Sequence, residues 1–194
     1  MEIPKSVEDA KRIYQSNHNT NWWDAIFKEI KNVCIAFEKY DGKQYEIPSN
    51  YTKMNCHLIF DINMGENFRC KARMVAGGHV TNVPSRITYS SVVSRYSVRI
   101  FFMIVALNDL KVIGCDIQNA YLTAPTQEKI WTIAGPKFVS EKGCIMMLVR
   151  ALYGLKSSGA EFLSLLAETL YSLDYCPSYK YPDVWIRPTV KSDG

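Results

Sequence analysis

The sequence lacks any hydrophobic run long enough to cross a membrane. Its longest strictly apolar stretch covers residues 100–107, whereas a membrane-spanning helix needs roughly 18–20 apolar residues. The first dozen residues carry six charged side chains and no apolar block, so no secretion signal is visible. We therefore expect a soluble protein that stays inside the cell and has no membrane partner.

Closely spaced cysteine pairs and internal repeats are also absent. The six cysteines form no Cys-x-x-Cys pair and are spread over the whole chain, whereas disulfide-stabilised domains are shorter and denser in cysteine. No low-complexity tract or linker divides the sequence. These absences argue against a disulfide scaffold and against a zinc finger, and they predict one compact unit with reduced thiols.

The basic residues, in contrast, are concentrated in one stretch. Residues 67–115 hold seven basic side chains and one acidic side chain, a local charge of +6, while the whole chain has a net charge of +4. Residues 1–66 carry −2, and residues 116–194 are neutral. Such clustering would attract a polyanion over a long range. The alternative is an ordinary solvated face.

Local patterns predict a mixture of helices and strands. Two helices should begin after Ser6 and Thr20, residues that commonly cap helices. Residues 57–62 and 68–76 read as a β-hairpin in which Lys71 and Arg73 share one face, because they are two positions apart. Further helices are expected at 92–107 and 159–173, and further strands at 111–116, 130–133, 145–150 and from 184 onwards.

Two groups of residues could carry chemistry. Asp116 would end a strand, where a carboxylate could bind a hard cation such as Mg²⁺; alternatively, it caps the following turn. Lys71 and Arg73 would suit a triphosphate, since arginine adds bidentate hydrogen bonds to phosphate. The alternative for this pair is an exposed sheet face.

Several motifs, taken in order, resemble one protein family. Residues 71–79 (Lys-Ala-Arg-Met-Val-Ala-Gly-Gly-His), 116–122 (Asp-Ile-Gln-Asn-Ala-Tyr-Leu) and 151–160 (Ala-Leu-Tyr-Gly-Leu-Lys-Ser-Ser-Gly-Ala) are similar to motifs of the reverse transcriptase domain of Ty1/copia-type retrotransposon polyproteins. The helix around Trp22, the stretch after Tyr89 and the segment at Asp183 also resemble this family. The resemblance covers nearly the whole chain and corresponds to the N-terminal part of that domain.

This resemblance implies an α+β fold, comprising the fingers and part of the palm of a right-hand polymerase. The fingers would cover approximately residues 1–108 and 124–155, and the partial palm approximately 109–123 and 156–194. The implied activity is RNA-directed DNA synthesis by nucleotidyl transfer with two Mg²⁺ ions, a dNTP and an RNA or DNA template–primer. The implied location is the cytoplasm, a virus-like particle or the nucleus, and the oligomeric state stays open.

The resemblance also implies roles for individual residues. Asp116 would be the catalytic, metal-binding carboxylate, assisted by the carbonyl of Ile117. Lys71 and Arg73 would bind the phosphates of the incoming nucleotide, and Tyr121 would lie under the sugar and exclude a 2′-hydroxyl. Contacts with the template–primer are expected from Gly154, Lys156, Ser157, Ser158, Arg95 and Arg99.

The sequence also departs from the family pattern. It contains no Asp-Asp pair, although the other two catalytic carboxylates of the family belong to a Tyr-x-Asp-Asp hairpin. Cys70 replaces the usual Arg, and Phe162 replaces the usual Trp. We therefore expect a truncated copy that is inactive by itself. The alternatives are a non-catalytic nucleic-acid-binding remnant of a decayed element and a pseudogene product without function.

Overall fold

The computed structural model describes residues 2–65, 68–78, 88–135, 138 and 141–188. Its chain begins with two helices, α1 (Val7–Asn17) and α2 (Asn21–Val33). The hydroxyl of Ser6 accepts a hydrogen bond from the backbone N–H of Asp9 at 3.1 Å, which satisfies one of the free donors at the start of α1. The two helices predicted for this region are therefore confirmed.

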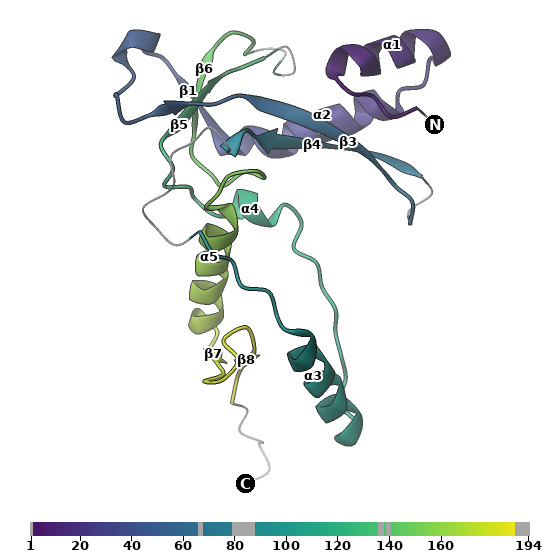
Figure 1. The fold of residues 1–194 in the computed structure, drawn as a ribbon, viewed down its shortest axis with the longest axis vertical. Coiled ribbons are helices and arrows are strands. Elements are labelled where there is room, and N and C mark those ends of the chain that lie inside the picture. The colour runs from purple at the N-terminus through teal and green to yellow at the C-terminus, as the bar shows by residue number, and fades with distance from the viewer. Residues whose placement is uncertain (1, 66–67, 79–87, 136–137, 139–140, 189–194) are drawn as a thin grey trace.

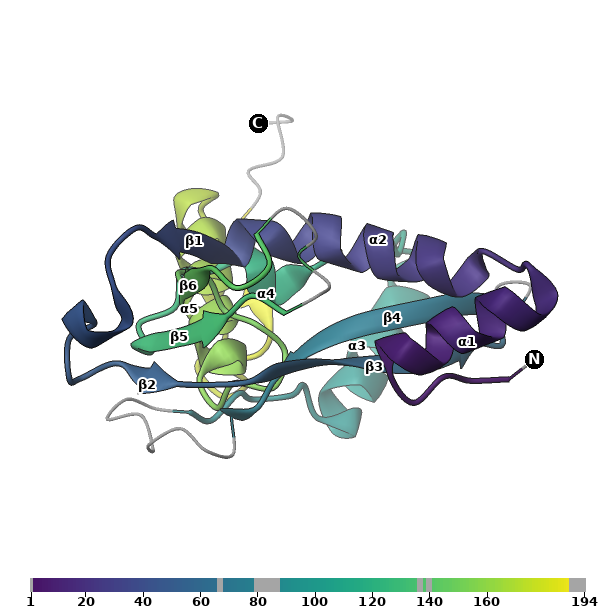
Figure 2. The same ribbon diagram turned by 90° about the horizontal axis from the view of Figure 1, so that it is seen from above.

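A long β-hairpin follows. Strands β3 (Cys56–Asn63) and β4 (Arg69–Ala76) pair antiparallel, with Ile59 opposite Arg73. Along β4, side chains from Cys70 to Met74 alternate between buried and exposed, because successive residues of a strand point to opposite faces. The helix α2 packs along β4 (Figure 2). The predicted hairpin is confirmed, and Lys71 and Arg73 lie on its exposed face.

A four-stranded sheet lies beside the hairpin. Its strand order is β1-β6-β5-β2, with antiparallel pairing except between β2 and β5. The strands are β1 (Phe37–Tyr40), β2 (Thr52–Lys53), β5 (Ile130–Ile133) and β6 (Ile145–Leu148), and two short 3₁₀ helices, η1 (Cys34–Ala36) and η2 (Gln44–Glu46), join them to their neighbours.

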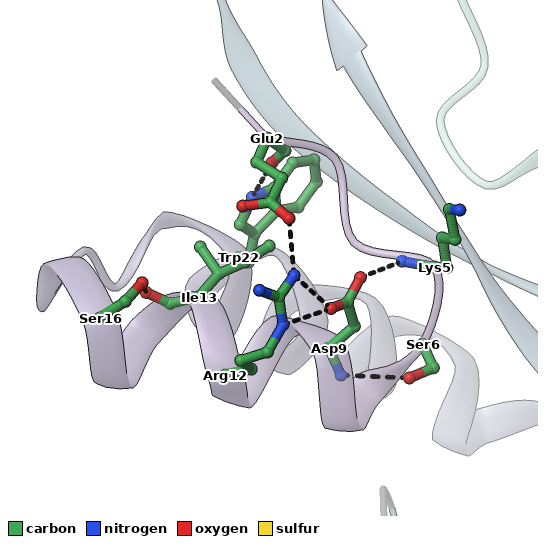
Figure 3. A network of polar contacts seen from close by, with 8 residues as sticks. All are labelled: Glu2, Lys5, Ser6, Asp9, Arg12, Ile13, Ser16 and Trp22. Atoms are coloured by element: carbon green, nitrogen blue, oxygen red, sulfur yellow. Dashed lines mark hydrogen bonds and ion pairs between the residues drawn. The ribbon is translucent and has the colours of Figure 1, made fainter.

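A continuous core holds the N-terminal helices, the hairpin and the sheet together. Trp22 is 3% exposed and meets Phe60 of β3 edge to face, with ring centroids 5.7 Å apart. Its indole N–H donates to the carbonyl of Glu2 at 3.1 Å, and Arg12 forms ion pairs with Glu2 and Asp9 (Figure 3). The first residues are therefore fastened across α1 and onto Trp22.

Helix α4 (Ala120–Thr123) joins this packed region through Leu122, which is 6% exposed and belongs to the core. The remaining elements extend away from it. They are α3 (Arg95–Leu107), α5 (Ser158–Ser172), β7 (Cys176–Pro177) and β8 (Trp185–Ile186). Figure 1 shows α5 and α3 projecting along the long axis of the molecule. The accessible surface is 13979 Å², against about 9,400 Å² for a compact monomer of this mass. The chain therefore exposes more surface than a compact monomer of this mass.

The strand predicted for residues 111–116 does not form. This segment has no regular secondary structure, and Ile113 in it is 91% exposed. A strand requires a neighbour for its backbone N–H and C=O groups, and no strand in the described part of the chain pairs with this segment.

Helix α3 itself forms, but it begins at Arg95 rather than at residue 92. Its apolar side chains are largely uncovered: Phe101 is 49% exposed and Phe102 is 53% exposed. Across the residues that the structure describes, neither α3 nor any other helix is both long enough and apolar enough to cross a bilayer.

Candidate functional site

A cavity of about 570 Å³ lies where α2, β4 and the residues around α4 meet. Lys71 and Arg73 of β4 line this cavity together with Asp116, Ile117 and Tyr121, which come from a distant part of the sequence. The structure therefore unites the residues predicted to bind a nucleotide. The charged side chains lining the cavity are Lys28, Glu29, Arg69, Lys71, Arg73 and Asp116.

The cations of this cavity outnumber its carboxylates by four to two. Three of the four cations alternate along β4, so the pleat of one strand presents them together. The fourth, Lys28, comes from α2 and was not predicted as a site residue. The packing of α2 against β4 brings Lys28 to the cavity. The sequence alone does not specify which side of the helix faces the hairpin.

Glu29 is a second residue that the sequence reasoning missed. Its carboxylate accepts a hydrogen bond from the backbone N–H of Met74 at 2.7 Å, so it covers a donor on the edge of β4 that does not face β3. Burial raises the pKa of Glu29 above its ordinary value, while the Met74 hydrogen bond and the charges of Arg73 and Lys71 oppose that shift. The cavity thus contains a half-buried acid beside its cations.

Asp116 lines the cavity and is exposed in the irregular segment that precedes α4. The N-cap residue of α4 is Asn119, whose φ of 53° lies in the left-handed region. Asp116 is thus not the N-cap of α4. Its carboxylate is accessible to a ligand in the cavity.

Tyr121 is held between two other aromatic rings. Its ring centroid lies 6.1 Å from that of Tyr153 and 6.3 Å from that of Phe162 on α5. Tyr153 in turn lies under the guanidinium of Arg73, 4.8 Å from ring centre to Cζ. Tyr153 belongs to the third sequence motif, but its side chain was not predicted to be part of the site.

Gly154 lies tightly against the end of the hairpin. The backbone N–H of Ala76 donates to the carbonyl of Tyr153 at 2.7 Å. Gly154 has a φ of 97°, and a Cβ added there would lie 2.3 Å from the carbonyl oxygen of Ala76. Only glycine combines this backbone conformation with this close approach. Gly154 therefore has a structural reason to be glycine.

The serines after Gly154 face inward rather than toward the cavity. The hydroxyl of Ser157 donates to Glu128 at 2.5 Å, and that of Ser158 donates to the carbonyl of Leu152 at 2.7 Å. Both serines are buried. The template contact predicted for Ser157 and Ser158 would therefore have to involve their backbone. Lys156, between Leu155 and Ser157, is half-buried.

The other two residues predicted to contact the template–primer lie far from the cavity. Arg95 and Arg99 are exposed on α3, and α3 lies toward the opposite end of the long axis from β4 (Figure 1). The basic stretch seen in the sequence is thus divided among a group on β4, a pair on α3 and Lys111 in the irregular segment after α3. Arg86, which also belongs to that stretch, lies outside the described residues.

The described residues do not form a complete metal site. Among them, no group of three or more His, Cys, Asp or Glu side chains is arranged to hold a metal ion. Two carboxylates line the cavity, and that of Glu29 already accepts a hydrogen bond from Met74. Two-metal chemistry requires several carboxylates around the ion pair. Asp116 alone therefore does not fit a two-metal centre.

Comparison with known proteins identifies the family. The sequence model of the family described as reverse transcriptase (RNA-dependent DNA polymerase) matches residues 43–191. The chain therefore belongs to the reverse transcriptase family. No solved structure gives a significant match.

Similar proteins are retrotransposon polyproteins. The Retrovirus-related Pol polyprotein from transposon TNT 1-94 of Nicotiana tabacum is 25% identical over 75% of this chain and 11% of its own length. The Truncated transposon Ty1-A Gag-Pol polyprotein of Saccharomyces cerevisiae is 27% identical over 76% of this chain and 12% of its own length. The chain thus spans about a tenth of these relatives. The resemblance to Ty1/copia-type reverse transcriptase domains is confirmed.

Proposed function

We propose that the cavity binds the incoming nucleotide of an RNA-directed DNA polymerase. The observation that carries this proposal is that one cavity joins Lys71 and Arg73 with Asp116 and Tyr121. The two cations would hold the triphosphate, because a guanidinium offers paired N–H donors to phosphate oxygens and an ammonium adds a point charge. The backbone of Ile117, which also lines the cavity, would contact the phosphates as well.

Tyr121 would select the sugar. Its ring is supported by Phe162 on one side and by Tyr153 on another, so it cannot easily move aside. A ring fixed beneath the sugar would collide with a 2′-hydroxyl and would favour deoxynucleotides. The experiment for this role is a comparison of dCTP and CTP affinity in the Tyr121→Ala variant.

We infer that the chain comprises polymerase fingers and part of a palm. The fingers would be residues 1–108 and 124–155, and the partial palm 109–123 and 156–194, both approximately. The packed helices α1 and α2, the hairpin and the four-stranded sheet all fall within the fingers ranges, which supports this division, although α3 in the same range extends from them (Figure 1). Arg95, Arg99 and Lys156 would then contact the template–primer, and Gly154, Ser157 and Ser158 would do so through their backbone.

Catalysis would further need two Mg²⁺ ions and additional carboxylates. Asp116 is proposed as one ligand, and the 194 residues contain no Asp-Asp pair to supply the others. We therefore expect the purified chain to bind nucleotide without extending a primer in the presence of Mg²⁺ or Mn²⁺. Primer extension that depends on a template and is abolished by Asp116→Asn would contradict this expectation.

Nucleotide affinity tests the proposal directly. Titration of the 194-residue chain with dCTP should show binding that Lys71→Ala or Arg73→Ala each weakens by about tenfold or more, because each variant removes a charge-assisted contact. Lys39→Ala on β1 is the matched control, since Lys39 is an exposed strand cation outside the cavity. Equal dCTP affinities in all three variants would contradict the proposal that this cavity binds the nucleotide.

A second candidate is non-catalytic binding of nucleic acid. The exposed cations Arg95, Arg99 and Lys111, together with the incomplete carboxylate set, favour it. Binding of a primer–template should then weaken steeply as salt rises, because bound cations release counterions from the phosphates. Replacing these three residues by Ala should flatten that dependence. An unchanged slope would identify them as ordinary solvated residues.

A further inference from the structure

We propose that Tyr153 is a positioning residue that fixes the Arg73 guanidinium and the Tyr121 ring relative to each other. The inference rests on the proposed nucleotide-binding function and adds a residue to it. Tyr153 would set the spacing between the phosphate-binding end and the sugar-binding end of the cavity. Three contacts of Tyr153 carry the argument.

The first contact orients Arg73. The guanidinium carbon lies 4.8 Å from the centre of the Tyr153 ring, within the range over which a cation is attracted to an aromatic face. A guanidinium stacked on a ring keeps its N–H donors in its own plane, where they can reach phosphate oxygens. In the described part of the chain, no carboxylate forms an ion pair with Arg73. The ring is thus a contact that directs the guanidinium without competing for its donors.

The second contact fixes the backbone of Tyr153. Its carbonyl accepts the hydrogen bond from Ala76, which lies on the same strand as Arg73. The tight approach of Gly154 to the Ala76 carbonyl holds the next residue in place. The backbone at 153 is therefore attached to β4 independently of the tyrosine side chain, so a change of side chain need not displace it.

The third contact reaches Tyr121. The rings of Tyr153 and Tyr121 are inclined by 31° with centroids 6.1 Å apart, and Phe162 supports Tyr121 from α5. Arg73, Tyr153, Tyr121 and Phe162 thus form a continuous series from four different segments. Tyr153 is 45% exposed, so core packing does not explain why an aromatic residue stands at this position. Its position between Arg73 and Tyr121, the two ligand-binding groups, does explain it.

A double-mutant cycle tests the link to Arg73. The Kd for dCTP is measured by calorimetry on the 194-residue chain for Tyr153→Leu and Tyr153→Phe, each alone and combined with Arg73→Ala or Lys71→Ala. Tyr153→Leu should weaken binding by roughly two- to fivefold alone and with Lys71→Ala, but not with Arg73→Ala. Tyr153→Phe keeps the aromatic face and should bind like the unmodified chain. The proposal would be overturned if Tyr153→Leu weakened dCTP binding as much in the Arg73→Ala background as in the unmodified chain, or if it did not weaken binding at all.

The link to Tyr121 has its own readout. Tyr153→Leu should lower the preference for dCTP over CTP by roughly two- to tenfold, the range for a lost aromatic pair, whereas Tyr153→Phe should retain it. An unchanged preference would show that Tyr153 does not position Tyr121. Failure of the proposed function is distinguishable: the unmodified chain would then not bind dCTP, or Lys71→Ala and Arg73→Ala would have no effect, and the inference would fall with it.

Discussion

The hairpin region (β3 and β4) and the α3 region (α3 and residues 111–116) are both rich in apolar residues, yet only the hairpin region has a core. Met74 of β4 is fully buried, with 0% exposure, whereas Met103 of α3 is 56% exposed. Likewise, Val75 is 8% exposed and Ile113 is 91% exposed. Apolar composition therefore did not determine burial. The difference is that β4 has neighbours on two sides, α2 and β3, whereas α3 and the segment after it extend from the packed region.

This contrast shows what a strand requires besides a suitable sequence. The stabilisation of a strand depends on cross-strand and facing contacts rather than on the backbone preference of its residues. Residues 69–76 pair along their whole length with β3. Residues 111–116 have a comparable apolar content but no partner strand in the described part of the chain, and they remain irregular.

The largest effect is expected from truncating one methionine in each region. Met74→Ala should lower the free energy of unfolding by about 2–5 kcal/mol, because it removes buried surface and leaves a cavity. Met103→Ala deletes the same atoms from an exposed helix position and should change stability by less than about 0.5 kcal/mol. Urea denaturation followed by circular dichroism measures both. Similar losses for the two variants would show that α3 is packed in solution.

The sequence predicted those elements whose signals are local. The cap at Ser6, the alternation along β4 and the apolar face of α2 each depend on neighbouring residues, and each appears in the structure. The strand at 111–116 was predicted from the same kind of signal and does not form. Its formation depends on a partner, which a local pattern cannot supply.

The site residues divide in the same way, into those with a local signal in the sequence and those defined by tertiary contacts. Lys71, Arg73, Asp116 and Tyr121 were found because they belong to recognisable motifs, and one cavity contains them all. Glu29 and Tyr153 were missed as site residues because their roles come from contacts with β4. Those contacts are set by tertiary packing, for which a motif gives no distance.

An intermediate effect is expected at two glycines with positive φ. Gly154→Ala should destabilise the packed region by about 1–3 kcal/mol or more, since it adds backbone strain and a Cβ 2.3 Å from the Ala76 carbonyl oxygen. Gly143 has a φ of 84° but nothing within 4 Å of an added Cβ. Gly143→Ala should therefore cost only about 1 kcal/mol. Equal losses in urea denaturation would mean that the close approach at Gly154 does not contribute.

The smallest effect is a pH dependence that separates two carboxylates within the packed region. Burial raises the pKa of Glu29, so the folded state holds its proton more tightly than the unfolded state does. Its contribution to stability is present below the ordinary pKa of 4.5 and is lost as pH rises through the raised value. Glu29→Gln keeps a carbonyl acceptor for Met74 and should become more stable than the unmodified chain as pH increases.

Asp9 provides the control of opposite sign. The backbone hydrogen bond from Lys5 and the side-chain hydrogen bond from Arg12 lower its pKa below 3.8 (Figure 3). The stabilisation by Asp9 is therefore present above the ordinary pKa of 3.8 and is lost as pH falls through the lowered pKa of the folded state. Asp9→Asn should lose stability relative to the unmodified chain at neutral pH, and the difference should disappear in acid.

The urea midpoint of the three proteins, measured from about pH 3 to pH 8, separates these two behaviours. The charges of Lys71 and Arg73 on β4 act on Glu29, and Asp116 lines the same cavity. The two cations oppose the effect of burial, so repeating the series with Arg73→Ala should enlarge the advantage of Glu29→Gln at high pH. The opposite slopes would follow from burial at Glu29 and from exposed hydrogen bonds at Asp9. Parallel slopes for the two variants would mean that Glu29 is solvated like a surface residue, and the cavity wall would then be open to water.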